Sequence, residues 1–446
     1  MNTNLSITVK GENLMVKTIV TGLLILAMLI PAVYVQSLVE ERKQRQQEVV
    51  KEVSGKWANS QTVAGPYLLV PVTSFASTGN EASTAKLPVT KTMVLLPTHL
   101  RVNGELKPEL RRRGIYKVAL YNSRLQLDGH FDLTAVKPAA GETIEWDKAA
   151  LCLGITDTRG ISTQVAANWN GQPLAFDAGV PAGGLASMGL SQQVPINANE
   201  LDRPVSFSIP LQLKGSESLM LLPLGKTTEW QLQSPWPSPS FTGKFLPTFT
   251  SDASGFKANW KVLHFNRDFP QVWKGETFKA DAYGFGVSLL QPADHYAKTM
   301  RSVKYAILFI GLMFGFFFLL EILLGYRVHP VQYLLIGIAL VVFYCLLLSI
   351  GEVLTFNISY ALATLATVTL ITAYTRHLFG TLKNALLIGG FLAGLYGFIF
   401  VLIQLEDTAL LVGSIGLFVL LALAMQLSRR ITWYETTKPA EDQSGS

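Results

Sequence analysis

The chain has 446 residues, of which 49% are hydrophobic and only 15% are charged. Soluble globular proteins are about 25% charged, so this composition argues against a disordered protein and against an ordinary cytosolic enzyme. The net charge of +6 could indicate nucleic-acid binding, but the positions of the charges must decide that question. Two cysteines are too few for a disulfide scaffold.

The first predicted element is an apolar run at about residues 14–35, which follows a short N-terminal segment, residues 1–13. A bilayer core about 30 Å thick needs roughly 20 helical residues, so this run predicts a first transmembrane helix. A cleaved signal peptide is the alternative. The apolar stretch is long for that role, and bulky residues follow Pro31, so we favour an uncleaved signal anchor.

Residues 36–53 are good helix formers with charges of both signs and only a thin apolar stripe. They predict a juxtamembrane helix that leaves the bilayer. A solvated stalk is the favoured interpretation, and a lipid-binding face is the alternative.

Residues 54–300 predict one large β-rich domain. Apolar and polar residues alternate over 125–133 and again over 205–213, which is typical of half-buried strands. Pro210 falls on the polar side of the second run and indicates an edge or a bulge there. We therefore predict an antiparallel domain, either a sandwich or an open barrel.

Residues 305–427 predict a transmembrane bundle of five helices, so that the fold class is a six-helix membrane protein with the β-rich domain inserted between helices 1 and 2. The predicted spans in this bundle are residues 305–324, 331–350, 358–374, 385–404 and 408–427. Residues 428–446 remain as a tail. Two small-xxx-small motifs, Gly311–Gly315 and Gly390–Gly394, predict close helix packing.

The orientation of the spans follows from the Lys and Arg residues in the short loops. One set of linkers and the C-terminal tail are basic, through Arg327, Arg376, Lys383, Arg429 and Arg430. The alternate linkers carry only acids, namely Glu352, Glu406 and Asp407. We therefore predict a multi-pass protein of the bacterial cytoplasmic membrane with both termini cytoplasmic and residues 36–300 periplasmic. The basic charge then reports orientation in the bilayer, and nucleic acid is not an expected partner.

No catalytic or metal-binding motif stands out in the sequence. GxSxG, HExxH and CxxC are absent, and the six histidines are scattered. We therefore predict no catalytic residue, no metal and no cofactor, and expect Cys152 to be a buried inert thiol.

Glu321 is the residue of the bundle with the strongest claim to a function. It is the one charge in its apolar run, about one turn from the predicted cytoplasmic end, and a carboxylate inside a membrane is costly. Arg327 and His329 follow within eight residues and could pair with it. One interpretation is an ion relay or a conformational latch, and the favoured one is a paired interfacial residue.

Arg301 and Lys304 flank the entry to the second predicted span, just after Pro292–Asp294. We interpret this segment as a rigid hinge that transmits the position of the β-rich domain to the bundle.

Many short blocks, in order from about residue 20 to 435, resemble the CreD family. In the membrane they include Lys304–Ala306, Glu321, His329-Pro330, Gln332-Tyr333 and Phe343-Tyr344 through Ser349; outside it they include Gly65-Pro66, Arg113–Tyr116, Asp157–Ile161, Trp236–Pro247, Ser254–Phe256 and Gln291–Asp294. One departure follows the third span, where Gly351-Glu352-Val353 stands in place of a Ser-Glu-His pattern. A role for that histidine cannot be transferred.

The resemblance implies a protein of the Gram-negative inner membrane that is linked to cell-envelope integrity and controlled by a two-component system. A sensor histidine kinase is then the expected regulatory partner, beside the lipid bilayer and a periplasmic envelope component. The family brings no established catalytic residues. We expect a non-enzymatic protein whose periplasmic domain binds an envelope component. The alternatives are a permease-like transport component and a sensor or regulator that couples a periplasmic signal to the bundle.

Overall fold

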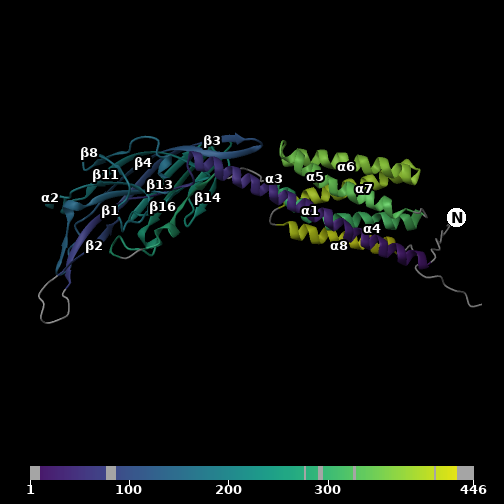
Figure 1. The fold of residues 1–446 in the computed structure, drawn as a ribbon, viewed down its shortest axis with the longest axis horizontal. Helices are drawn as coiled ribbons and strands as arrows, with labels where there is room; N and C mark the ends of the chain where they lie inside the picture. Colours follow the sequence, from purple (N-terminus) through teal and green to yellow (C-terminus); the bar gives the residue numbers. More distant parts are fainter. Residues whose placement is uncertain are drawn as a thin grey trace, which may run out of the picture. The chain divides into compact units, whose positions relative to one another are not determined.

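The computed structural model describes residues 11–76, 87–275, 278–289, 295–324, 328–405 and 408–428 (Figure 1). The chain divides into two compact units. A helical unit comprises Met1–Arg45 and Ala293–Ser446, and a β unit comprises Gln46–Pro292.

Two sheets make up the β unit. The ten-stranded sheet has the order β14-β18-β12-β1-β6-β10-β9, with β2 and β5 paired to β1 and β17 paired to β2. Its strands are β1 (Gln61–Ala76), β2 (Leu87–Leu95), β5 (Glu142–Ile144), β6 (Ala150–Ile155), β9 (Asp177–Ala178), β10 (Gly189–Gln193), β12 (Ser218–Leu221), β14 (Ser240–Gly243), β17 (Val272–Lys274) and β18 (Phe285–Ser288).

The eight-stranded sheet has the order β15-β16-β13-β3-β4-β11-β7-β8. Its strands are β3 (His99–Arg113), β4 (Tyr116–Phe131), β7 (Ala166–Trp169), β8 (Gln172–Ala175), β11 (Val205–Ser216), β13 (Thr227–Ser234), β15 (Thr248–Asp252) and β16 (Gly255–Leu263). Short helices connect some strands: α2 (Ala198–Leu201), η1 (Trp146–Lys148), η2 (Thr158–Gly160), η3 (His264–Asn266) and η4 (Ala280–Tyr283).

The main hydrophobic core joins the two sheets face to face, because one cluster of buried side chains draws on both. Leu127 and Ile209, predicted to face inward, are opposite each other on β4 and β11 and fully buried. The structure therefore resolves the prediction as a sandwich and not an open barrel. The prediction that the domain is antiparallel was incomplete, because β1 pairs with β12 and β3 pairs with β13 in parallel.

Pro210 lies at a locally open edge, as its position on the polar side of the strand predicted. Although β11 has neighbours on both sides, its ladder with β7 covers only the pairs at Phe207 and Ser208. Pro210 pairs with Gln126 of β4 in the other ladder. The missing N–H is therefore tolerated, because no long ladder with β7 requires it.

A single helix, α1 (Gly11–Trp57), contains both the predicted signal anchor and the predicted juxtamembrane helix. Its 47 residues pass from the apolar first half into the charged second half without a break, and Pro31 lies inside it. The helix therefore belongs to the helical unit as far as Arg45 and to the β unit from Gln46 onward.

The remaining helices are apolar, apart from α3. They are α3 (His295–Lys304), α4 (Ala306–Leu324), α5 (Pro330–Gly351), α6 (Phe356–Phe379), α7 (Leu382–Gln404) and α8 (Ala409–Ser428). Among the described residues, four helices are long and apolar enough to span a membrane, or five when the bent pair α3 and α4 counts as one span. The prediction of six spans was wrong by about one. The reason lies in the last helix, since the apolar part that is described, Ala409–Leu423, is shorter than a bilayer requires.

The glycines that pack closely are not the predicted ones. Among the described residues, no atom lies within 4 Å of a Cβ placed on Gly311, Gly315, Gly390 or Gly394. A Cβ on Gly389 would instead lie 2.3 Å from the hydroxyl oxygen of Thr372. Close packing of α6 and α7 therefore depends on a glycine one position before the motif.

Candidate functional site

A polar cluster around Glu321 lies inside the helical unit. The carboxylate is only 5% exposed and pairs with the ammonium group of Lys17 on α1. The backbone N–H of Val328 donates to Oε1 over 2.9 Å, and the Tyr333 hydroxyl donates to Oε2 over 3.1 Å. Three elements, α1, α4 and α5, thus meet at one carboxylate.

The start of α5 explains how two of these donors reach Glu321. Pro330 occupies the first turn, where its missing N–H costs nothing, and His329 caps the helix. The His329 Nδ1 accepts from Val331 N–H over 3.3 Å, and the His329 N–H donates to the Gln332 side chain over 2.8 Å. This capping box directs the preceding Val328 N–H toward Glu321.

Of the two predicted partners of Glu321, the structure tests only His329. His329 is engaged as a helix cap, and its ring makes no contact with the carboxylate among the described interactions. Arg327 lies outside the described residues. Lys17 was not foreseen, although it is the one charge in the first apolar run, and two lone opposite charges in apolar helices are expected to find each other.

Arg301 and Lys304 lie at the end of α3 and are exposed. The axes of α3 and α4 meet at 43°, with the break beside Lys304. The bend lies where a hinge was expected, but the Pro292–Asp294 segment is outside the described residues, and the role of a hinge stays a prediction.

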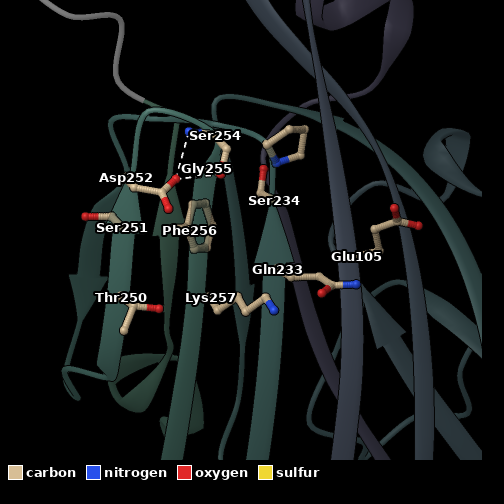
Figure 2. A pocket seen from close by; sticks show the side chains of 11 residues that line it. Glu105, Gln233, Ser234, Thr250, Ser251, Asp252, Ser254, Gly255, Phe256 and Lys257 are labelled. Carbon is tan, nitrogen blue, oxygen red and sulfur yellow. Dashed lines mark hydrogen bonds between the residues drawn. The ribbon is translucent and has the colours of Figure 1, made fainter.

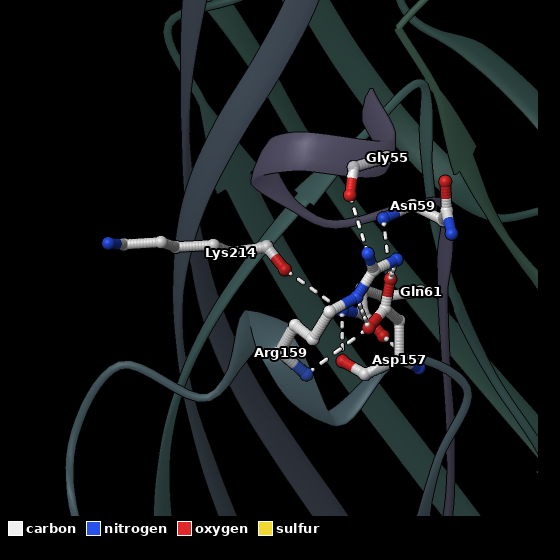
Figure 3. A network of polar contacts seen from close by, with 6 residues as sticks. All are labelled: Gly55, Asn59, Gln61, Asp157, Arg159 and Lys214. Atoms are coloured by element: carbon white, nitrogen blue, oxygen red, sulfur yellow. Dashed lines mark hydrogen bonds and ion pairs between the residues drawn. The ribbon is translucent and has the colours of Figure 1, made fainter. Parts of the chain in front are cut away.

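A second polar network holds the end of α1 within the β unit (Figure 3). Asp157 accepts hydrogen bonds from the Arg159 guanidinium at 2.6 and 2.9 Å and from the Asn59 N–H at 3.0 Å. Arg159 also donates to the carbonyl of Gly55, in the last turn of α1, over 2.5 Å. Gln61 bridges the carbonyls of Asp157 and Lys214. The turn after β6 therefore clamps the junction of α1 and β1.

The electrostatics of this clamp are favourable. The guanidinium of Arg159, followed by the backbone N–H groups of Asn59 and Arg159, lowers the pKa of Asp157 to about 2. The Arg159 pKa rises for the same reason. Trp57, the last residue of α1, lies under two cations, with Arg111 at 4.5 Å and Lys214 at 4.7 Å from its ring. Charged hydrogen bonds and cation–π contacts together thus fix the C-terminal end of α1.

The outer face of the eight-stranded sheet is hollowed by two adjoining pockets of about 420 and 390 Å³. Glu105, Gln233 and Lys257 line both, so the two pockets form one groove. Figure 2 shows the larger pocket, with Thr250, Lys257, Gln233 and Glu105 in a line across β15, β16, β13 and β3. At its far end Asp252 accepts from the Ser254 hydroxyl and N–H, which lowers the Asp252 pKa.

The exposed side chains of the groove are mainly the polar members of strands whose other members form the core. Along β13, exposed Gln231 and Gln233 alternate with buried Trp230 and Leu232. Such alternation in a half-buried strand places the polar side chains on the outer face of the sheet. The sequence could not show that polar residues of five strands lie together, because the strand order is set by pairings between distant segments.

Two further observations do not indicate a catalytic or metal-binding site. Burial raises the pKa of Cys152 to about 12, so its thiol stays protonated, as expected of an inert cysteine. Within the described ranges, no three His, Cys, Asp or Glu side chains are grouped so as to hold a metal ion.

Comparison with solved structures gives little help. The M1 zinc metallopeptidase of Deinococcus radiodurans, for example, matches at 12% identity over 37% of this chain and 38% of that chain, with a TM-score of 0.18. A point mutant of the same metallopeptidase gives the same values. At such a TM-score the likeness carries no argument about fold or function.

The sequence comparisons are decisive about the family. The family model described as "Inner membrane protein CreD" matches residues 13–434. The inner membrane protein CreD of Escherichia coli (strain K12) is 31% identical over 419 residues, which cover 93% of this chain and 92% of that protein. The resemblance inferred from scattered sequence blocks is thereby confirmed, and the chain belongs to the CreD family of inner membrane proteins.

Proposed function

We propose that the protein is a non-enzymatic, membrane-anchored binding protein that supports the integrity of the cell envelope, with its β unit in the periplasm. The observation that carries the proposal is the polar groove on the outer face of the eight-stranded sheet. A groove on a rigid sheet, in a domain attached to apolar helices, suits a protein that holds an envelope component near the inner membrane.

The lining of the groove favours binding over catalysis. Its four charged residues, Glu105, Arg124, Asp252 and Lys257, balance one another. The two acids do not pair with each other, since Asp252 accepts from Ser254 and Glu105 pairs with Lys107 at 3.2 Å. Such a set of side chains can orient a ligand but offers no activated nucleophile.

The orientation in the membrane is part of the proposal. Basic linkers at Arg327 and at Arg376–Lys383 support a cytoplasmic N-terminus and a periplasmic β unit. Arg429 and Arg430 support a cytoplasmic C-terminus as well, whereas a count of five spans would place it in the periplasm. Alkaline phosphatase fused at the C-terminus decides between these two, because that enzyme is active only in the periplasm.

Site-specific photocrosslinking in cells tests the binding function. A photoreactive amino acid at Gln231 in the groove should capture an envelope component, whereas the same group at Gln172, an exposed residue of β8, should not. If both positions capture the same species equally, or neither captures any, the groove is not a binding site.

A second candidate, a regulator that couples a periplasmic signal to the membrane, is favoured by α1. One unbroken helix carries Lys17, which pairs with Glu321 in the helical unit, and Trp57, which is clamped in the β unit. A change at one end of such a helix has a direct route to the other. The partner would be the sensor histidine kinase of the controlling two-component system.

The coupling role has its own test. Glu321→Gln should alter the output of the two-component system, read from a reporter gene, while the protein level in the membrane stays normal. An unchanged reporter with normal protein levels would exclude a coupling role for this cluster.

A further inference from the structure

The middle of the groove holds a row of carboxamide side chains. Strand register places Asn259 of β16 opposite Gln231 of β13, and Gln231 opposite Asn103 of β3. Opposite side chains on neighbouring strands lie about 5 Å apart. All three are exposed, and none has a hydrogen-bond partner for its side chain among the described residues. Their donors and acceptors are therefore open to a ligand.

The neighbouring rows behave differently. On one side Glu229 is saturated within the protein, by Lys261 and Arg101, each at 3.3 Å. On the other side Lys257, Gln233 and Glu105 line the groove, and Arg124 follows on β4. The row of unpaired carboxamides thus lies between two charged rows. In one of them the charges pair within the protein, and in the other the charged residues line the groove and balance one another.

These features exclude several kinds of occupant. Both edges of β16, β13 and β3 are paired with other strands, so an added peptide strand has no free backbone to bind here. Balanced charge gives no basis for binding nucleic acid or another polyanion. The lining offers no broad apolar platform, since Phe256 and Leu232 are buried and Pro235 is the one exposed apolar ring among the lining residues. The remaining fit is a neutral polymer rich in hydrogen-bonding groups.

The spacing and chemistry point to one such polymer. Neighbouring strands are about 4.8 Å apart, and a β1,4-linked hexose chain advances by nearly that distance per sugar, so a chain laid across the strands meets one carboxamide per sugar. Successive sugars in such a chain are turned over, so alternate sugars direct an acetamido group at the sheet, and its C=O and N–H match the donor and acceptor sides of a carboxamide. We propose that the groove binds an N-acetylhexosamine glycan strand of the cell-wall type. This inference rests on the proposed binding function and names its ligand class.

Binding of this kind is expected to be weak. The groove is open, and it lacks the stacking ring that strengthens many sugar sites, so a dissociation constant of about a millimolar is expected for a short oligosaccharide. A long glycan carries many copies of the repeat, which raises its retention through avidity.

The test uses the full chain in detergent micelles and chitohexaose, the hexamer of N-acetylglucosamine, as the probe. Saturation-transfer NMR titrations should show binding to the wild type and about tenfold weaker binding to N103A/Q231A, which loses two bidentate carboxamides. Q172A, which removes an exposed carboxamide on β8, should bind like the wild type. Circular dichroism confirms that all variants are folded.

Each other outcome overturns a stated part of the inference. Equal binding of cellohexaose, which has hydroxyl groups in place of acetamido groups, would overturn acetamido recognition. Preferential binding of heparin would show a charge-driven site. Chitohexaose binding that N103A/Q231A leaves unchanged would place the glycan elsewhere, and no glycan binding would overturn the ligand class. If crosslinking from Gln231 still captures another envelope component, the binding function survives all of these results.

Discussion

The helical unit and the β unit each bury a carboxylate, and they stabilise it by opposite means. Asp157 of the β unit pairs with Arg159, two residues along the chain, together with backbone N–H groups nearby. Glu321 of the helical unit pairs with Lys17, which is 304 residues away in sequence. The first carboxylate is held mainly by its own turn, with one further hydrogen bond from Asn59, 98 residues earlier in the chain. The second stabilises contact between helices that are far apart in the sequence.

The difference follows from the surroundings. Outside the membrane, a turn supplies N–H donors and water supplies the rest, so a local partner is sufficient. Within apolar helices the backbone N–H groups are used by the helix itself, so a carboxylate must find its partners on other elements. A buried carboxylate in the helical unit is therefore expected to depend on partners from other elements, whereas one in the β unit can be held by its own turn.

The largest effect should come from Glu321→Ala. This change leaves the buried Tyr333 hydroxyl and Val328 N–H without their acceptor and unpairs the partly exposed Lys17 ammonium, at a combined cost of about 3 kcal/mol. The free energy of unfolding of the helical unit, measured by denaturant titration in micelles, should fall by that amount. In K17M/E321M part of the loss should be recovered, because two apolar side chains replace the ion pair while the Tyr333 hydroxyl still lacks its acceptor. If the losses of unfolding free energy in the two single variants add up to the loss in the double variant, Lys17 and Glu321 do not act as a pair.

A loss about half as large is expected for Asp157→Ala. The variant removes the acceptor of Arg159 and Asn59, two of whose hydrogen bonds are charge-assisted, at a cost of about 1.5 kcal/mol. The loss should appear in the unfolding of the β unit, followed by tryptophan fluorescence, and not in that of the helical unit. An equal loss of unfolding free energy in the helical unit would contradict the view that Asp157 acts within the β unit.

The same residue predicts a pH dependence. The folded pKa of Asp157, about 2, lies below the ordinary value of about 3.9, so the ionised form favours the folded state. Its contribution is complete above about pH 4 and declines as the pH falls toward 2. Asp157→Asn should therefore flatten the stability of the β unit in this range, as measured by denaturant titrations at several pH values. If stability falls with pH equally steeply in Asp157→Asn and in the wild type, other carboxylates dominate acid unfolding.

A smaller effect, about 1 kcal/mol, is expected when Trp57→Leu removes the ring beneath Arg111 and Lys214. Leu keeps an apolar side chain at the end of α1, so the comparison isolates the cation–π contacts. Thermal unfolding of the β unit is the measurement. A loss that persists in R111M/K214M would show that ring burial, and not the cations, explains the effect.

The smallest effect should come from Glu352→Gln. Glu352 lies 3.7 Å from Arg42, and their side chains are 18% and 45% exposed, so solvent weakens the pair. Exposed ion pairs contribute about 0.5 kcal/mol or less, and the unfolding free energy should barely change. A loss comparable to that of Glu321→Ala would show that exposure does not govern pair strength in this unit.

The sequence predicted the features that depend on composition and on the regular spacing of apolar residues. The apolar runs at residues 331–350 and 385–404 correspond to α5 and α7, and the alternation over 205–213 corresponds to β11. It did not predict pairings between distant segments. The parallel ladder of β3 with β13, the partner of Glu321 and the groove all depend on strand or helix order, which a single sequence does not encode locally. The number of spans failed for a different reason, because α8 lies near the length limit.

The alternation of Gln231 and Gln233 with Trp230 and Leu232 has a consequence for evolution. Groove residues and core residues are interleaved along each strand but face opposite sides of the sheet. A codon change in the groove therefore alters ligand preference without disturbing the interior packing. Related proteins could diverge in what they recognise while keeping the same sandwich, with the substitutions confined to every second position of β13, β16 and β3.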